Sequence, residues 1–256
     1  MSDVALAVLL VLGAMVVAVA GFVAVDRLVP RDRREANNEV AGFIYAVVGP
    51  MYAILLAFVV FVVWGHFEDA KAGVATEANE LAGIWRQAQG LDAAHQRALQ
   101  AVAVAYATDV TELDWPLLSS SRLSPKTDQD LADMYQVILT LPVQTARDQA
   151  LYAQLLSEVH NLANERRVRL LRTQDTLHPV LWVVLVIGAV VTVAYAYVFG
   201  MKDRVVHAAL IAALAGTVVG MLCMIKLIDG PFQGTVTVGP DAFEAILRTM
   251  TAGPPP

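Results

Sequence analysis

The chain of 256 residues is 57% hydrophobic, carries a formal net charge of -6 and contains one cysteine. Its apolar residues lie in long blocks, which excludes an ordinary soluble protein and indicates an integral membrane protein. The modest negative charge without a basic tract excludes nucleic acid as a partner, and the lone Cys223 excludes an intramolecular disulfide.

Two apolar blocks at the start of the chain are each long enough to cross a membrane. The first, over 4–25, has no positively charged segment before it and no obvious cleavage site, so we expect a retained membrane helix rather than a signal peptide. The second, over 40–64, carries no charged residue. A short polar connection joins them, which predicts two antiparallel spans within residues 1–64.

The second span holds a Gly49-Pro50 pair near its middle. Proline removes a backbone N–H group and clashes with the preceding turn, so we predict a helix kink at Pro50. In a membrane, the carbonyl groups freed by a kink need neighbouring helices or water. The second span should therefore have packed neighbours rather than act as a simple anchor.

The polar region over 65–177 has apolar residues that recur at helical spacing. We expect the second span to continue into it as a helix over 66–89. The pattern predicts three further helices, over 92–114, 128–141 and 144–173, with a break at Trp115-Pro116 and the polar run over 119–127. Because amphipathic helices must bury their apolar stripes, the region is expected to be an all-helical extramembrane domain.

Two further apolar blocks follow His178-Pro179, over 180–199 and 205–228. The short turn between them predicts an antiparallel hairpin. These blocks are the third and fourth spans, within residues 178–228, and residues 229–256 are expected to form a C-terminal tail. The predicted fold is all-α, with four transmembrane helices and a helical extramembrane domain between the second and third.

Nothing in the spans indicates catalysis, because no carboxylates, histidines or nucleophile converge there. After the second span, Glu68, Asp69, Glu77 and Glu80 lie near His66. Their spacing is typical of a solvated helix face, which we favour over a metal or ion site. The other histidines are dispersed along the chain. We therefore expect no enzyme, no catalytic residue, no metal and no cofactor.

The second span is the best candidate for a pore wall. Apolar pores gate by dewetting, and four spans with few polar groups need several subunits to enclose a path. Two faces of the helix fit the spacing, one with Gly49, Ala53, Leu56 and Val60, the other with Tyr52, Leu56, Val59 and Val63. Contact with lipid or other helices fits the same spacing. Our candidate pore-lining residues are Gly49, Tyr52, Ala53, Leu56 and Val60.

Several separated motifs of the chain resemble one family, in that family's order. They are the segment 37–64, E-A-N at 77–79, D-W-P at 114–116, R-V-R-L at 167–170 and D-G-P-F-Q-G at 229–234. The chain thereby resembles the bestrophin-like family of bacterial membrane proteins. The resemblance extends over 37–243, and the first apolar block matches only in character.

This family is similar to the bestrophins, which are homopentameric anion channels with four spans per subunit and a helical cytosolic part between the second and third. The resemblance implies a homo-oligomer, a pentamer, that passes inorganic ions passively across the lipid bilayer of a bacterial inner membrane. It also implies that the helical region and both termini are cytoplasmic, whereas the charges of the short loops lean slightly the other way. Residues in a setting similar to the bestrophin pore neck are Pro50, Ile54, Leu55, Leu56, Ala57 and Phe58.

After the last span, bestrophins carry proline, phenylalanine and glycine, followed by an acidic run that helps to hold calcium. Here Gln233 separates Phe232 from Gly234, and few acids follow. This departure argues against calcium gating. The candidate gating or ion-contact segment comprises Asp229, Pro231, Phe232 and Gly234.

A non-conducting membrane scaffold or sensor, whose helical domain binds a partner, is the alternative to a channel. The helical stripes fit both functions equally well. A closed ring with a continuous axial path would favour the channel, and a monomer or a lipid-plugged ring would favour the scaffold. The charge of a permeant ion does not follow from the second span, where no ring of arginine or lysine is visible.

Overall fold

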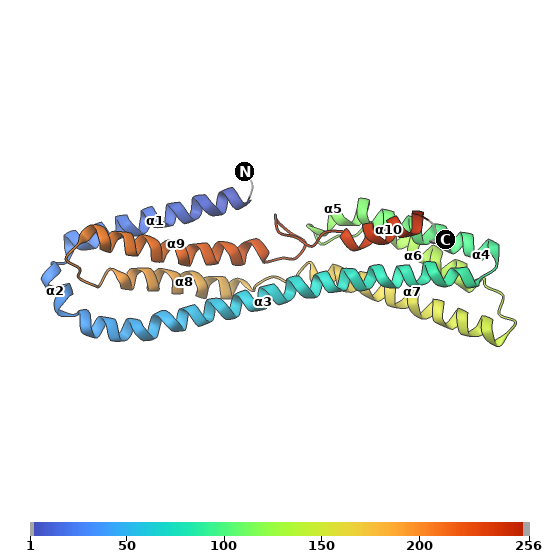
Figure 1. The fold of residues 1–256 in the computed structure, drawn as a ribbon, viewed down its shortest axis with the longest axis horizontal. Coiled ribbons are helices and arrows are strands. Elements are labelled where there is room, and N and C mark those ends of the chain that lie inside the picture. Colours follow the sequence, from blue (N-terminus) through green and yellow to red (C-terminus); the bar gives the residue numbers. More distant parts are fainter. Residues whose placement is uncertain (1–2, 253–256) are drawn as a thin grey trace. The chain divides into compact units, whose positions relative to one another are not determined.

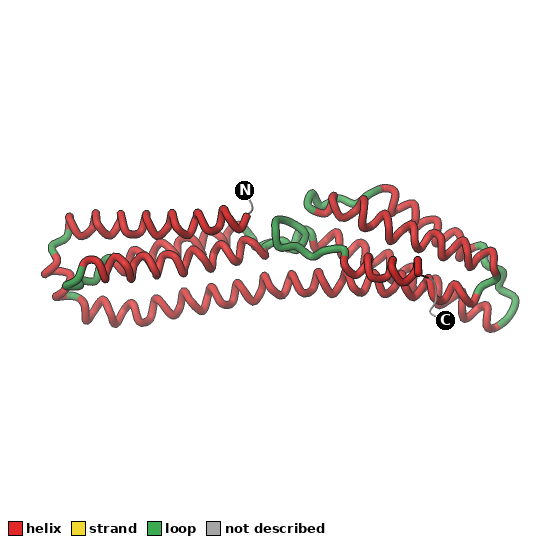
Figure 2. Tube along the Cα trace, turned by 45° about the horizontal axis from the view of Figure 1, so that its top comes forward, coloured by secondary structure: helices red, strands yellow, loops and turns green. Residues whose placement is uncertain are grey.

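A computed structural model describes residues 3–252 of the chain (Figure 1). Every regular element among these residues is a helix, and Figure 2 shows helices joined by loops without a strand. The chain divides into two compact units. The first comprises the residues up to Gly65 together with Thr176–Asp229, and the second comprises His66–Asp175 together with the residues from Gly230 onward. The all-α prediction is confirmed.

The first unit holds four helices that are long and apolar enough to cross a membrane. They are α1 (Asp3–Leu28), the first part of α3 (Asn38–Gln87), α8 (Pro179–Ala196) and α9 (Arg204–Ile228). The short α2 (Arg31–Ala36) lies in the connection between α1 and α3. Helix α9 packs along both α1 and α8 (Figure 1). The prediction of four spans is thereby confirmed.

Helix α3 has packed neighbours within the first unit, as expected. Its buried residues Tyr52, Leu56 and Val59 join one core with residues of α8 and α9. The Tyr52 hydroxyl donates to the carbonyl oxygen of Leu185 at 2.9 Å, and its ring lies against Gly188 of α8. A Cβ atom at Gly188 would overlap that ring. Glycine at this position therefore sets how closely α3 and α8 approach.

Polar contacts tie the connection between α1 and α3 to the turn between α8 and α9. The buried Arg34 side chain pairs with Asp26 and donates to the carbonyl oxygen of Phe199 at 3.5 Å. Asn38 exchanges two hydrogen bonds with Gly200, of 2.8 and 2.9 Å. The two short loops at this end of the unit are thus held together by charge and amide contacts.

The second unit is built from the rest of α3 and the remaining helices. These are a 3-10 helix (Ala88–Gly90), α4 (Ala93–Asp109), a π-helix (Val110–Asp114), α5 (Trp115–Leu118), α6 (Pro125–Leu139), α7 (Ala146–Arg172) and α10 (Asp241–Ala252). The side chains of Asp92, Ser124 and Thr145 cap the first turns of α4, α6 and α7. Helix α3 continues unbroken from the second span, and the other predicted helices of this region are confirmed within a few residues.

The predicted break lies within the polar run over 119–127, as expected, but it does not begin at Trp115-Pro116. Helix α4 passes directly into the π-helix and α5, and the chain leaves the helical conformation only after Leu118. Pro116 stands in the first turn of α5. Proline is tolerated in a first helical turn, where its missing N–H group costs little.

The predicted C-terminal tail contains a helix, α10, that the sequence analysis did not anticipate. Its buried Phe243 and Met250 join the core of the second unit, and α10 packs against α4. Phe243, Ile246 and Met250 repeat at helical spacing, which is the signal that could have identified the helix.

Replacing Gly188 with alanine should weaken the packing of α3 on α8. The new methyl group would overlap the Tyr52 ring, and such overpacking costs about 1–3 kcal/mol. Thermal unfolding in detergent should show a lower Tm for Gly188→Ala. Gly13→Ala is the matched control, because no atom lies within 4 Å of a Cβ at Gly13. Equal Tm values for the two variants would contradict this packing.

Candidate functional site

The membrane-spanning part of α3 has two contrasting faces. One face packs against α8 and α9 of the same chain, and the opposite face is exposed. On the exposed face, Ile54, Phe58 and Phe61 are 69%, 65% and 74% exposed. With Phe43 and Val47, they are separated by three, four or seven positions and so form a single stripe along the helix. We call this set of five residues the exposed stripe.

The exposed phenylalanine and tryptophan side chains of the first unit are concentrated on α3. Among the described residues, the exposed phenylalanine and tryptophan side chains are those of Phe43, Phe58, Phe61 and Trp64, all on α3. The large exposed apolar side chains of α1 and α8 are valine, leucine and isoleucine. The second span therefore differs in chemistry from its neighbours on the face that its own chain leaves uncovered.

The five residues that the sequence analysis proposed as a pore lining differ in burial. Tyr52 and Leu56 are buried within the chain, Gly49 and Val60 are half-buried, and Ala53 is exposed. Packing against α8 and α9 argues against Tyr52 and Leu56 as pore-lining residues. Helical periodicity specifies which residues share a face, but it does not specify what that face contacts.

The segment proposed for gating is engaged by its own chain. The buried Asp229 carboxylate accepts hydrogen bonds from the backbone N–H of Leu177 at 2.8 Å and from the indole N–H of Trp182 at 3.2 Å. In the second unit, the buried Phe232 ring meets Trp115 edge-on at a centroid distance of 6.2 Å. Gly234 adopts a positive φ of 87°. Within their own units, these residues contribute to hydrogen bonding, packing and turn geometry.

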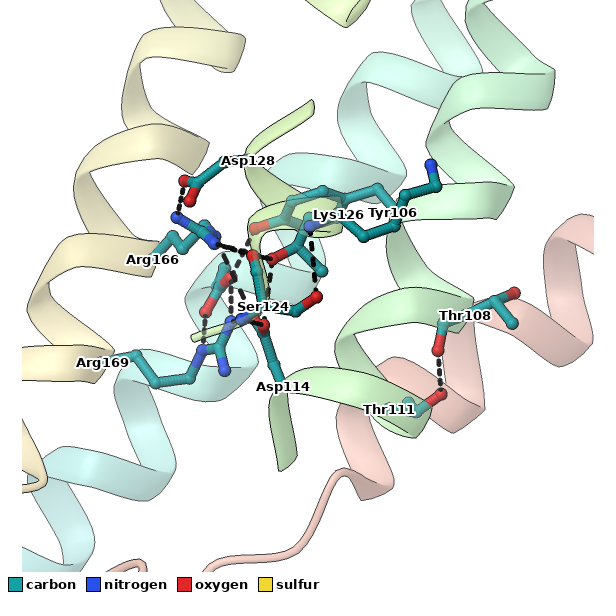
Figure 3. Close-up of polar contacts among 11 residues, drawn as sticks. Tyr106, Thr108, Thr111, Asp114, Ser124, Lys126, Asp128, Arg166 and Arg169 are labelled. Atoms are coloured by element: carbon teal, nitrogen blue, oxygen red, sulfur yellow. Dashed lines mark hydrogen bonds and ion pairs between the residues drawn. The ribbon is translucent and has the colours of Figure 1, made fainter. Parts of the chain in front are cut away.

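A buried charge network lies at the centre of the second unit (Figure 3). Arg169 of α7 donates from Nε to Glu77 of α3 at 2.8 Å and from Nη2 to Asp114 of the π-helix at 3.0 Å. The Tyr106 hydroxyl of α4 donates to Glu77 at 2.8 Å. All four side chains are at most 2% exposed. Burial and the charge of Glu77 raise the pKa of Tyr106, so the phenol stays protonated and keeps donating.

A second arginine extends the network towards α6. The Arg166 guanidinium donates to Thr127 at 2.6 Å and to Asp128 at 2.5 Å. Asp114 also accepts from the Thr127 hydroxyl at 2.9 Å and from the backbone N–H of Ser124 at 2.7 Å. The network thus joins side chains from α3, α4, the π-helix, α6 and α7.

The sequence analysis assigned Glu77 to a solvated face, and the structure shows that this is wrong. Glu77 lies on the same side of α3 as the buried Val74 and Ala78, and its charge is compensated by Arg169. Three members of the network lie in the recognised motifs: Glu77 in E-A-N, Asp114 in D-W-P and Arg169 in R-V-R-L. Only the tertiary structure shows that these motifs meet. Within residues 3–252, no group of three or more histidine, cysteine, aspartate or glutamate residues could hold a metal.

Replacing Arg169 with methionine should strongly destabilise the second unit. Glu77 and Asp114 would remain buried without their shared partner, and breaking a buried pair in this way costs about 3–5 kcal/mol. Chemical denaturation of the whole chain measures the loss. Arg248→Met is the control, since its pair with Glu244 is 3.9 Å long and exposed, and such pairs contribute about 0–1 kcal/mol. Similar losses for both variants would contradict a central role for the network.

Comparisons with known proteins agree with the resemblance seen in the motifs. A family model described as Bestrophin-like domain matches residues 12–243, and a search of curated proteins finds no match. Crystal structures of a bacterial bestrophin homologue from Klebsiella pneumoniae share the fold. One variant is 15% identical, with 95% of this chain and 99% of that chain covered and a TM-score of 0.68. A second variant is 14% identical, with 94% and 99% covered and a TM-score of 0.71. The crystal phased with zinc is 17% identical, with 98% and 100% covered and a TM-score of 0.63.

Proposed function

The chain belongs to the bestrophin-like family, and from that premise we propose that it is a homo-oligomeric channel through which small ions pass passively along the exposed stripe of α3. The observation that carries the proposal is the stripe itself. The face opposite it is already occupied by α8 and α9. The stripe must therefore meet lipid, another subunit or an aqueous path.

The side chains of the exposed stripe favour contact with an aqueous ion path over contact with lipid. Aliphatic side chains cover the exposed faces of α1 and α8, as expected of surfaces that meet lipid tails. The exposed face of α3 instead carries the bulky, rigid rings of Phe58 and Phe61 beside Ile54. Rings of such residues around a symmetry axis make an apolar constriction, which opens and closes to ions by wetting and dewetting.

The assembly and location that we propose follow the family. Five subunits around one axis would bring five stripes together, so that each level of the neck is a ring of identical side chains. The spans would lie in the inner membrane of a bacterium, with the second unit and both termini in the cytoplasm. Gly49 and Val60 are half-buried beside the packed face of α3, whereas Ala53 and Pro50 are exposed. We retain Pro50 as a proposed kink within the neck.

Single-channel recording in planar bilayers tests the proposal. Ile54→Ala and Phe58→Ala should change the unitary conductance, because they alter the width of the apolar constriction. Leu56→Ala should leave conductance unchanged but lower stability by about 2–5 kcal/mol, since it opens a cavity inside the subunit. Leu9→Ala, on the exposed face of α1, should change neither quantity.

Two results would overturn this assignment. If the protein is folded and oligomeric but silent at every voltage and pH tested, it is a scaffold or sensor and not a channel. If Leu56→Ala changes the conductance and the two stripe variants do not, ions follow another face of α3.

A further inference from the structure

The second unit has an open groove along α7 that its own helices leave uncovered. The groove measures about 690 Å³ and its walls are mostly apolar. Tyr135 of α6 contributes to one wall, and α7 contributes Tyr152, Ala153, Leu156 and Ser157 among others. On α7, the small side chains of Ala153 and Ser157 lie between the larger ones on one helix face, which is the relief into which the side chains of another helix can pack.

Helix α4 presents a face of complementary shape in the same unit. Ala94, Ala98 and Ala101 are exposed, and the half-buried Ala105 follows them. The four alanines are three or four positions apart, so they form one stripe along the helix. The opposite side of α4, with Leu99 among others, is buried in the core of the unit. We call these four residues the alanine face, which allows larger side chains to approach the helix closely.

Helices α4 and α7 of one subunit run in the same direction at matching heights. Asp92 and Asp148, at the starts of α4 and α7, line one cavity of about 200 Å³. At the other end, Arg169 of α7 donates to Asp114, just beyond α4, at 3.0 Å. Asp114 is 22 positions after Asp92, and Arg169 is 21 positions after Asp148. Residues equally far from these two aspartates therefore lie at about the same height.

The groove and the alanine face are each followed by a charge without a partner. Arg167 lies seven positions after His160, which also lines the groove, and seven positions are about two turns of one helix face. Glu112 lies eleven positions after Ala101, or about three turns, on the side of the alanine face. Both side chains are exposed, and neither forms an ion pair or hydrogen bond with any residue over 3–252.

Neighbours along the helix do not compensate either charge. The residues three and four positions to each side of Arg167 are uncharged. The charged residue at such a distance from Glu112 is another acid, Asp109, whose carboxylate lies 3.5 Å from Lys126. Lys126 also pairs with Asp130. Opposite charges at similar heights are thus left free at the ends of two different surfaces of one unit.

We propose that the alanine face of one subunit packs into the α7 groove of the next subunit, with Glu112 paired to Arg167 of the neighbour. The inference rests on the homo-oligomer proposed above and names the surfaces that join it. In a ring of more than two copies, each contact joins two different surfaces of the chain. One groove and one separate face that fits it are what such a ring requires.

The matching heights within a subunit support this pairing. A rotation about an axis parallel to α4 and α7 leaves the height of every residue unchanged. Ala101 and Ser157 are each nine positions after the aspartate at the start of their helix. The rotation therefore brings Ala101 level with Ser157 of the neighbour, and Glu112 level with Arg167 to within about one helical residue, 1.5 Å.

Disulfide crosslinking of the full-length protein tests the contact. In a Cys223→Ala background, Ala101→Cys combined with Ser157→Cys should link neighbouring subunits under mild oxidation, so that denaturing gels show a ladder of covalent species. Either change alone should give no crosslink, and co-expression of the two single variants should give dimers and nothing larger. Ala101→Cys combined with Thr249→Cys, an exposed position on α10, is the control and should give no ladder.

A charge exchange tests the ion pair in the same cysteine background. Arg167→Glu and Glu112→Arg should each lower the yield of the ladder several-fold, because each change places like charges opposite one another. The two changes together should restore the yield, since the pair re-forms with its charges reversed. This recovery separates a contact between subunits from a folding defect in either single variant. Arg248→Glu, on α10, is the control and should leave the yield unchanged.

The outcomes distinguish this interface from the proposed function. If the wild type is oligomeric by gel filtration but the cysteine pair gives no ladder, or if the charge changes do not alter the yield, the interface is overturned and the channel assignment stands. A folded but monomeric wild type overturns both. A ladder with charge recovery from a protein that passes no current supports the interface and overturns the channel.

Discussion

One long helix constrains the rest of this structure. Helix α3 runs from Asn38 to Gln87 and contributes to both units. Its buried face is apolar in each, with Tyr52 and Leu56 in one core and Leu81 and Ile84 in the other. Because each core forms on α3, neither can be completed without it. The exposed side chains of this helix change from phenylalanine at Phe61 to glutamate at Glu68 within about two turns.

The second unit depends on a different interaction. Its helices are amphipathic and mostly polar outside, so their buried stripes hold them together only where polar groups in the core are satisfied. At the centre of the unit, Arg169 donates hydrogen bonds to Glu77 and Asp114, and Tyr106 donates to Glu77. These side chains come from four different elements. Burial opposes the charge of Arg169, yet the two carboxylates hold its pKa above the ordinary value. The arrangement is mutually dependent, because no member of it can be buried alone.

Membrane and water impose opposite requirements on the two units. The four spans can leave apolar side chains uncovered, since lipid accepts them. Arg34 and Asn38 make polar contacts at the loops of one end of the spans. The second unit exposes charge and buries its aromatic rings, among them Phe232 and Phe243 around Trp115. The uncovered phenylalanines of α3 are the exception within the spans, and an exposed apolar face that its own chain leaves without a partner commonly marks a site of function or assembly.

The sequence by itself determined the four spans, the helical domain and the family resemblance, because long apolar runs, helical periodicity and short motifs are local properties. Tertiary structure decided which face of each helix is covered. Tyr52 and Ile54 are two positions apart in one apolar run, and only the packing of α8 shows that the first is buried and the second exposed. Glu77 and Glu68 likewise look alike in the sequence. One is buried because an arginine 92 positions later reaches it, and the other is exposed because nothing does, since such long-range pairing leaves no trace in local spacing.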